Sequence, residues 1–295
     1  MILLGKIMIA AAESGILIPE PLLNIYLNEQ NHRTLFLAEL SSQKAYLLSF
    51  SRETLSLQII REFSISSGKQ KGGKRSEWDL RTPEGVYEIT QFRPESSLEE
   101  KFGTGAFILN YPNDLDKILR KTGGGIWIHG TDRSDFIDFD SEGCIRLKNE
   151  DLTFLKDHLF PGQTPVFIVD KIIRKTAEDI FQENEKIKEM VNNWISTRQN
   201  RDLSGFLSFY HPTFYSTSEK MDIGDWSLFH KDRFEQNLPH SITMKELSFI
   251  YQDNYVLISC VEEIKRGTDP DRIKKNILWK RIDDHWFIVA ENIEN

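Results

Sequence analysis

The chain has 295 residues and a formal net charge of -8 at pH 7. This length favours two domains over one and is sufficient to bury a sizeable core. A hydrophobic fraction of 39%, with 19 Phe, 8 Tyr and 6 Trp, is ordinary for a globular protein and excludes a mostly disordered chain. Because the net charge is negative, the chain has no broad basic field, and we expect no nucleic-acid partner.

The amino-terminal segment, residues 1–32, opens on a short apolar run with one lysine and an alanine-rich end, MILLGKIMIAAAESG. This run has the outline of a signal peptide but a poorly charged start, so a cleaved leader and a retained N-terminus both stay open. Beyond it, no apolar run approaches the roughly 18 residues that a membrane helix needs. We therefore expect no membrane span other than this possible leader.

The two cysteines of the chain are Cys144 and Cys260. They are too few for a disulfide framework and do not form a CxxC zinc-ligand set, although one disulfide between them stays open. Cys260 lies within a strand-like apolar pattern, which favours a buried and inert residue.

Residues 33–172 consist of short runs rich in β-formers and aromatics, which predicts a mostly antiparallel β domain. One helix is expected inside it, since Leu152, Leu155 and Leu159 follow an aspartate at helical spacing. Before the strand at Gly85, Gly, Lys and Pro predict a loop whose lysines could steer an anionic ligand, although a solvated loop is the favoured interpretation. The expected strands are RTLFLAEL, KAYLLSFS, LSLQIIREFSIS, GVYEIT, AFILNYPN, GIWIHG, GCIRL and TPVFIVDK.

The character of the sequence changes near residues 172–180, where a long charged segment opens on a Thr-x-x-Asp pattern like a capping box. A short apolar helix or turn, LSGFLSFYHPTFYS, and then long alternating stretches follow. We expect a second, α+β domain over residues 176–295, with helices first and a curved sheet after them. The positions at helical spacing in the charged segment are Ile180, Ile187, Val191, Trp194 and Ile195.

The stretch IWIHGTDRSDFIDFDSEGCIRL contains a histidine and a cysteine 15 positions apart, His129 and Cys144. A thiolate is the reactive form of cysteine, and a neighbouring imidazole can take its proton and later give one to a leaving amine. His129 ends an apolar strand. Cys144 follows Gly143, where the backbone can approach a ligand and nearby amides could face an oxyanion. The pair therefore suits acyl transfer.

Three other interpretations of the same stretch stay open on spacing alone. Both residues could be inert core residues, which is the usual outcome for a lone Cys or His. The run DFDSEGCIRLKN places acids at EF-hand loop positions, but Asn149 stands where a bidentate acid belongs and the flanks look like strands. Zinc bound by His129, Cys144 and nearby aspartates has the weakest support, because the set holds one thiolate and scattered acids.

Five separated motifs, SSGK, RTPEGVYEI, IHG, SEGCIRL and GQTPVFIVD, occur in the order found in the bacterial L,D-transpeptidase catalytic domain. Residues 33–172 thus resemble that family, whose signature is His-Gly and then Ser/Thr-x-Gly-Cys, an apolar residue and Arg or Asn. The resemblance implies a β-rich sandwich and, as substrate, the peptide stem of peptidoglycan. It implies no metal and no organic cofactor.

By this resemblance, Cys144 is the nucleophile, His129 its base, and the backbone carbonyl of Gly130 the group that orients the imidazole. Cys144 would attack the carbonyl of the residue before the terminal D-alanine, typically meso-diaminopimelate, release D-alanine and leave a thioester. An amine acceptor then gives a crosslink or an attached protein, and water gives L,D-carboxypeptidase trimming.

Ser141, Gly143 and Arg146 fall on the remaining positions of the motif and are expected at the substrate. The resemblance places Arg146 near the substrate's carboxylates, with a surface ion pair as the alternative. Many members have a second histidine directly before Gly-Cys, where this chain has Glu142, and that departure concerns the choice of acceptor. The segment FILNYPNDLD resembles one in members that lack this histidine, and it adds two cleft candidates, Asn110 and Tyr111.

Residues 176–295 resemble, more weakly, the nuclear-transport-factor-like cone, in which helices cover a curved sheet and form a pocket. The resemblance rests on VNNWISTRQNRDLSGFLSFYHPTFYS and on a closing WKRIDDHWFIVAEN. Four residues are pocket candidates that we interpret as surface or structural residues: His211, Asp225, His230 and His285.

The pairing of the two domains resembles the cell-shape-determining L,D-carboxypeptidases of helical bacteria, which favours trimming over crosslinking. The sequence therefore predicts a peptidoglycan enzyme of the periplasm or cell envelope, where peptidoglycan is assembled, with stem peptides and glycan as partners. A cytoplasmic role in muropeptide recycling is the alternative location. The alternative function is a non-catalytic peptidoglycan-binding module. The sequence gives no signal for an oligomeric state.

Overall fold

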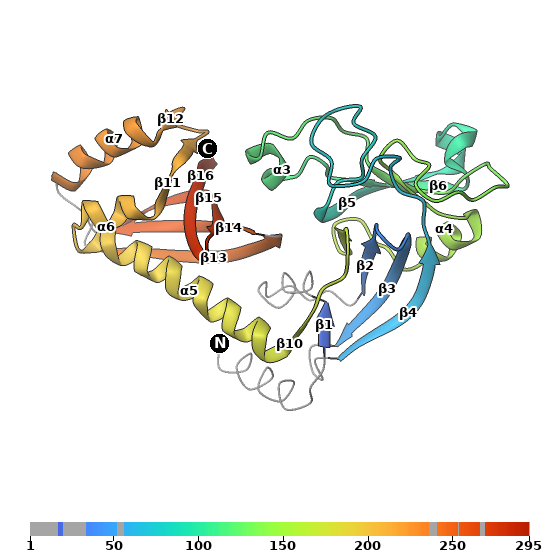
Figure 1. Cartoon of the computed structure of the whole chain (residues 1–295), viewed down its shortest axis with the longest axis horizontal. Coiled ribbons are helices and arrows are strands. Elements are labelled where there is room, and N and C mark those ends of the chain that lie inside the picture. The colour runs from blue at the N-terminus through green and yellow to red at the C-terminus, as the bar shows by residue number, and fades with distance from the viewer. Residues whose placement is uncertain are drawn as a thin grey trace. The chain divides into compact units, whose positions relative to one another are not determined.

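The computed structural model (Figure 1) describes residues 17–19, 34–51, 56–235, 241–252, 254–265 and 269–294. The run expected as a leader, residues 1–15, lies outside these ranges. The described chain divides into two compact units, with the division between Glu178 and Asp179. No helix in the described part of the chain is long and apolar enough to cross a membrane.

The first unit is built on an eight-stranded sheet with the order β4-β3-β2-β9-β5-β6-β7-β8. Neighbouring strands are antiparallel except for the pairs β2–β9 and β7–β8, which are parallel. The predicted β-rich, mostly antiparallel domain is therefore confirmed. The strands are β2 (Thr34–Glu39), β3 (Lys44–Ser51), β4 (Ser56–Ser64), β5 (Gly85–Pro94), β6 (Gly105–Leu109), β7 (Trp127–His129), β8 (Ile145–Arg146) and β9 (Pro165–Val169).

Strand β5 belongs to both halves of this sheet. Its first residues, 85–88, pair with β9, and the strand pairs with β6 from Ile89 onward, with a register shift between Ile89 and Gln91. Strand β2 lies between β3 and β9 and has four successive buried residues, 35–38, because both of its faces are covered. The hydrophobic core therefore continues from β2 and β3 to the strands β6, β7 and β8.

Two helices of the first unit support the strands around the core. Helix α4 (Asn149–Lys156) buries Leu152 and Leu155 as expected from their spacing, and Leu159 is buried just after its end. Helix α3 (Asp114–Ile118) was not expected, and it begins with a capping box between Asn113 and Asp116. Shorter elements are β1 (Leu17–Pro19), which pairs antiparallel with β10 (Arg174–Thr176), and the 3-10 turns η2 (Glu95–Ser97) and η3 (Glu100–Phe102).

The second unit begins with two helices, as predicted, and its sheet is antiparallel except for the parallel pair β11–β16. Helix α7, between β12 and β13, is an additional helix that the sequence did not indicate. The sheet has the order β12-β11-β16-β15-β14-β13. The elements are α5 (Ala177–Gln199), α6 (Leu203–Ser208), β11 (Tyr210–Ser216), β12 (Met221–Asp222), α7 (Ile223–Glu235), β13 (Ser241–Gln252), β14 (Tyr255–Lys265), β15 (Pro270–Ile282) and β16 (His285–Glu294).

Helix α5 buries Ile187, Val191 and Trp194 on one face, in agreement with their predicted spacing, whereas the side chain of Ile180 lies outside the described residues. Trp194 contacts the ring of Trp279 on β15 edge to face, with the ring centroids 6.2 Å apart. An aromatic interior thus holds helix and sheet together.

Charged groups are also buried in this unit. Lys275 Nζ lies 2.7 Å from Glu291 Oε1 and 3.1 Å from Glu262 Oε2, and Arg198 pairs with Glu262. Two cations and two anions therefore neutralise one another, as buried charges require.

Candidate active site

The parallel pairing of β7 with β8 brings the two sequence-predicted reactive residues together. His129 is the register partner of Arg146, and Ile128 is the partner of Ile145. Because side chains alternate along a strand, the isoleucines point into the core and their neighbours point to the other face. Cys144, directly before β8, is thereby placed on the same face as His129.

This face is open to a cavity of about 440 Å³, a size typical of small-ligand sites. Both His129 and Cys144 line it, and so do Ser141 and Arg146. The rest of the lining comes from the surrounding loops, the turn η3 and strand β7, and includes Lys74, Glu77, Trp78, Lys101, Phe102, Gly123, Gly124, Gly125, Trp127, Thr131, Asp132, Arg133 and Glu142.

His129 is buried, and its Nδ1 lies 2.6 Å from the carbonyl oxygen of Gly130. A carbonyl oxygen only accepts, so Nδ1 carries the proton and Nε2 keeps its lone pair. The pKa of His129 is lowered to about 4, chiefly by burial; the hydrogen bond to the Gly130 carbonyl opposes the shift, and the charge of Arg146 adds to it. The imidazole is therefore neutral at neutral pH, which is the form that accepts a proton.

Cys144 is half-buried, and its thiol donates to the carbonyl oxygen of Gly125 at 3.4 Å. Burial raises the pKa of Cys144 to about 11, a backbone hydrogen bond from Trp127 opposes the rise, and Glu142 adds to it. At rest the site thus contains a neutral thiol and a neutral imidazole. A proton must leave the sulfur before it can react.

Ser141 and Gly143 shape the turn that presents Cys144. The Ser141 hydroxyl donates to the Cys144 carbonyl oxygen at 2.6 Å and accepts from the Gly143 N–H at 3.1 Å. Gly143 has φ +133°, and a Cβ there would lie 2.8 Å from the carbonyl oxygen of Arg81. The Ser-x-Gly-Cys spacing therefore has a local structural reason, because no larger residue fits at the glycine.

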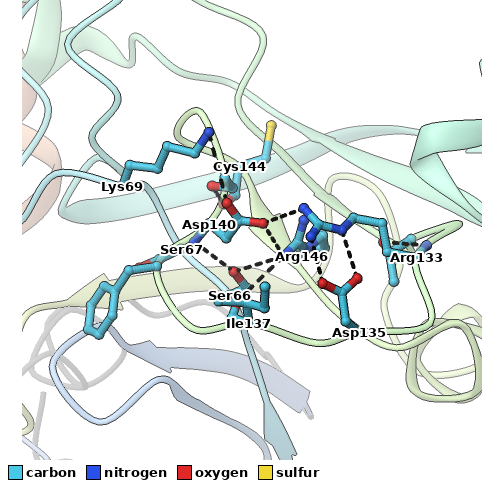
Figure 2. A network of polar contacts seen from close by, with 12 residues as sticks. Ser66, Ser67, Lys69, Arg133, Asp135, Ile137, Asp140, Cys144 and Arg146 are labelled. Carbon is cyan, nitrogen blue, oxygen red and sulfur yellow. Dashed lines mark hydrogen bonds and ion pairs between the residues drawn. The ribbon is translucent and has the colours of Figure 1, made fainter.

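Arg146 is buried at the back of the cavity and is part of the charge network in Figure 2. Its Nη2 lies 3.3 Å from Asp140 Oδ2 and donates to Ser66 Oγ at 3.4 Å. Asp140 also accepts from Arg133 at 2.5 Å. The ion pair of Arg146 is therefore internal rather than at the surface. Its Nε has no hydrogen-bond partner among the described residues.

Asn110 and Tyr111 do not line this cavity in the described structure. The Tyr111 hydroxyl donates to the carbonyl oxygen of Thr122 at 3.1 Å, and its ring is buried against Tyr87. Asn110 Oδ1 accepts from the backbone N–H of Glu88 at 2.9 Å. Their observed contacts are structural, and a contact of either residue with substrate stays a prediction.

Asn149, which the sequence marks only as a mismatch to a calcium loop, links two backbone segments next to His129. Its Oδ1 accepts from the backbone N–H groups of Thr104 at 3.1 Å and Thr131 at 3.0 Å. A Cβ on Gly130 would lie 2.2 Å from the same oxygen, so the glycine is needed for this close approach. Asn149 therefore fixes the peptide whose carbonyl bonds His129.

Lys74 is a second residue that the sequence did not single out. The solvated-loop interpretation is wrong for this lysine, because it is 3% exposed and its Nζ lies 2.7 Å from Asp79 Oδ1. Lys69 and Lys71 are exposed, as expected for that loop. The aspartate five residues after Lys74 is the one signal in the sequence for this ion pair.

The candidates of the second unit have structural or surface positions. His230 is buried among aromatic rings, including Trp226 at 4.5 Å between centroids, and burial lowers its pKa to about 3. His211 Nδ1 lies 2.7 Å from the hydroxyl oxygen of Thr213. Asp225 and His285 are exposed. Cys144 and Cys260 are both free thiols. No group of three or more His, Cys, Asp or Glu suited to a metal occurs in the described residues.

The fold and this site together define the class of protein. The YkuD family, the L,D-transpeptidase catalytic domain, matches residues 34–168, and the Cds6 C-terminal NTF2-like domain matches residues 186–292. Residues 34–168 are therefore an L,D-transpeptidase catalytic domain of the YkuD family, a family that acts on peptidoglycan, and an NTF2-like domain follows it in the chain. Both predicted resemblances are confirmed.

Two solved structures match this chain over the length of both units. Bd1075 of Bdellovibrio bacteriovorus is 23% identical with a TM-score of 0.70, and the match covers 94% of this chain and 98% of that chain. The helical cell shape determining protein Pgp2 of Campylobacter jejuni is 22% identical with a TM-score of 0.69, and the match covers 98% of each chain. No curated protein sequence matches this chain. At these identities the likeness shows a shared fold.

Proposed function

We propose that this chain is a cysteine enzyme that shortens the tetrapeptide stem of peptidoglycan by releasing its terminal D-alanine. The observation that carries the proposal is the shared cavity of Cys144 and His129, with His129 Nδ1 held by the Gly130 carbonyl at 2.6 Å. Residues 33–172 are the catalytic part in this proposal, and residues 176–295 are an accessory domain. Because the substrate lies outside the inner membrane, the enzyme works in the periplasm or cell envelope.

The first half of the reaction uses the neutral pair. As Cys144 Sγ attacks the carbonyl carbon before the terminal D-alanine, His129 Nε2 takes the thiol proton. The C–N bond then breaks, and the imidazolium gives its proton to the leaving amine of D-alanine. The products of this half are free D-alanine, a thioester on Cys144 and a neutral imidazole.

The second half decides the product. His129 takes a proton from the acceptor as the acceptor attacks the thioester carbonyl. The C–S bond then breaks, and the imidazolium gives its proton to the departing sulfur, which restores the Cys144 thiol and the neutral imidazole. Water gives a tripeptide, and an amine gives a new amide. We favour water, because the pairing of the two domains resembles cell-shape-determining L,D-carboxypeptidases, which use water as the acceptor. The same two-domain fold occurs in Pgp2, a helical cell shape determining protein.

The substrate-side residues of this proposal are Ser141, Gly143 and Arg146. Support comes from the position of Ser141 and Arg146 in the lining of the cavity and from the unpartnered Nε of Arg146. A carboxylate of the stem peptide would accept a hydrogen bond from the Arg146 Nε–H and would pair with the positive charge of the guanidinium group.

The test is mass spectrometry of purified disaccharide-tetrapeptide after incubation with the wild-type protein and with Cys144→Ala. Loss of D-alanine with the wild type alone supports the proposal, and a product joined through two diaminopimelates identifies a transpeptidase instead. If both proteins leave the substrate and an added acceptor unchanged, the chain is a non-catalytic peptidoglycan-binding module. Binding to sacculi that is equal for the two proteins would then be its signature.

A further inference from the structure

Trp78 presents a large apolar ring to solvent at the edge of the cavity. It lines the cavity and is 78% exposed, the highest value among the exposed large hydrophobic residues of the described chain. An indole ring in water forgoes the stabilisation that burial gives to aromatic side chains. The mechanism proposed above does not use Trp78. The position of this ring therefore needs another explanation.

The backbone that carries Trp78 is strained and firmly held. Its φ of +63° lies in the left-handed region, which is a rare conformation for a bulky residue. The carboxylate of Asp79 fixes the turn. Four donors share that carboxylate at 2.7 to 3.2 Å: the backbone N–H groups of Arg75, Ser76 and Arg81, and Lys74 Nζ. Strain that is held in place in this way is typical of functional positions.

The cavity wall next to this turn has no side chains. It consists of Gly123, Gly124 and Gly125, and a Cβ added to Gly124 or Gly125 would meet no atom within 4 Å. The two segments are in contact, because the N–H of Glu77 donates to Thr122 Oγ1 at 3.1 Å. The Gly125 carbonyl accepts from the Cys144 thiol. An open wall therefore extends from the indole to the candidate nucleophile.

We propose that Trp78 and Gly123–Gly125 form a subsite for a sugar ring of the glycan that carries the stem peptide. This proposal rests on the proposed function. The C–H face of a pyranose ring is flat and apolar and matches an exposed indole, and the glycine wall leaves room for its substituents. Glu77, exposed on the same rim, can accept hydrogen bonds from sugar hydroxyls.

The experiment compares two ligands that differ only in the sugar. Trp78→Ala, Trp78→Phe and wild type are assayed with disaccharide-tetrapeptide and with the free tetrapeptide. We expect Trp78→Ala to lower kcat/KM for the disaccharide ligand roughly tenfold and to leave the value for the free peptide within about twofold. Trp78→Phe should recover most of the loss, because it keeps an aromatic face.

Phe160→Ala is the matched control, since Phe160 is an exposed aromatic residue that does not line the cavity. It should leave both kcat/KM values unchanged. An equal loss on both ligands in Trp78→Ala would mean that Trp78 contacts the peptide, for example through the ammonium group of its diamino acid. That result, or no loss on either ligand, overturns the sugar subsite.

Calorimetry separates failure of this subsite from failure of the proposed function. In a Cys144→Ala background no turnover occurs, and Trp78→Ala should weaken binding of the disaccharide-tetrapeptide and not of the free tetrapeptide. This outcome supports the subsite even if the wild-type protein has no activity. Equal affinities of the parent and the Trp78→Ala protein for the disaccharide ligand, or no binding at millimolar concentration, overturn it.

Discussion

Asn149 and Thr131 are joined by two hydrogen bonds that run in opposite directions. Asn149 Oδ1 accepts from the Thr131 N–H at 3.0 Å, and Asn149 Nδ2 donates to the Thr131 carbonyl oxygen at 2.8 Å. The side-chain amide therefore pairs with this backbone residue as a neighbouring strand would. Because Thr131 follows Gly130, helix α4 determines the position of the carbonyl that holds His129.

This pairing predicts that Asn149→Asp lowers kcat about 10- to 100-fold with little change in KM, since a small misplacement of a catalytic group has effects of this size. Aspartate keeps the accepting oxygen but loses the donor to Thr131 and brings a negative charge against its carbonyl. Steady-state kinetics on the disaccharide-tetrapeptide measure the effect. Thr153→Ala, which removes a bond to the Asn149 carbonyl, is the control and should retain activity. Wild-type kcat in Asn149→Asp would contradict the role.

The lowered pKa of His129 predicts an unusual acid limit for activity. In the proposed mechanism the imidazole acts as a base in its neutral form, and with a pKa of about 4 that form persists well below pH 6.5. The profile of kcat/KM against pH should therefore fall on the acid side near pH 4. His158→Gln, a change outside the cavity, should leave the profile unchanged, and a midpoint near pH 6.5 in wild type would refute the prediction.

The raised pKa of Cys144 predicts slow alkylation of the ligand-free protein. With a pKa of about 11, the thiolate fraction and the rate of labelling by iodoacetamide should rise about tenfold per pH unit from pH 7 to pH 10. Peptide mass spectrometry locates the label and distinguishes it from the buried thiol of Cys260. A rate that levels off by pH 8 would instead show a thiolate already activated at rest.

Buried His230 predicts that acid destabilises the second unit. Burial, together with the charges of Arg198 and Lys275, lowers its pKa from 6.5 in the unfolded chain to about 3 when folded. Between these pH values the unfolded chain binds more protons at this site, so the free energy of unfolding falls as the pH falls.

The expected contribution of His230 is about 1.4 kcal/mol per pH unit across that window. His230→Phe removes the titrating group and keeps an aromatic ring, and it should reduce the slope of stability against pH by about one proton. Urea denaturation from pH 4 to pH 7 measures the slope. Equal slopes in the two proteins would show that His230 does not titrate in this way.

Much of the fold could be predicted because its elements follow local patterns. The strands of the first unit are short runs of β-formers, and the buried positions of α5 and α4 repeat at helical spacing. Helix α7 was missed because its buried face consists of Trp226, His230 and Phe234, aromatic and polar residues of modest helix propensity. The parallel pairing of β2 with β9 joins segments far apart in the sequence, which no local pattern reveals.

The candidate site likewise contains residues that the sequence predicted and residues that it did not. The placement of His129 and Cys144 in one cavity could be predicted, because a short motif carries both residues. Asn149 and Lys74 could not be, since their importance lies in contacts with backbone and carboxylate groups on other loops. Tyr111 was selected by its neighbours in the sequence, and its hydroxyl is bonded to the Thr122 carbonyl instead.

The burial of Cys144 has a consequence for the lifetime of the protein. Peroxides attack the thiolate much faster than the thiol, and repeated oxidation of a cysteine ends in irreversible acids. A sulfur with a pKa of about 11 remains protonated between reactions, and both cysteines of the chain are free of disulfides. In the proposed mechanism Cys144 loses its proton only as it attacks the substrate, so the protonated resting thiol is also a slow target for peroxides.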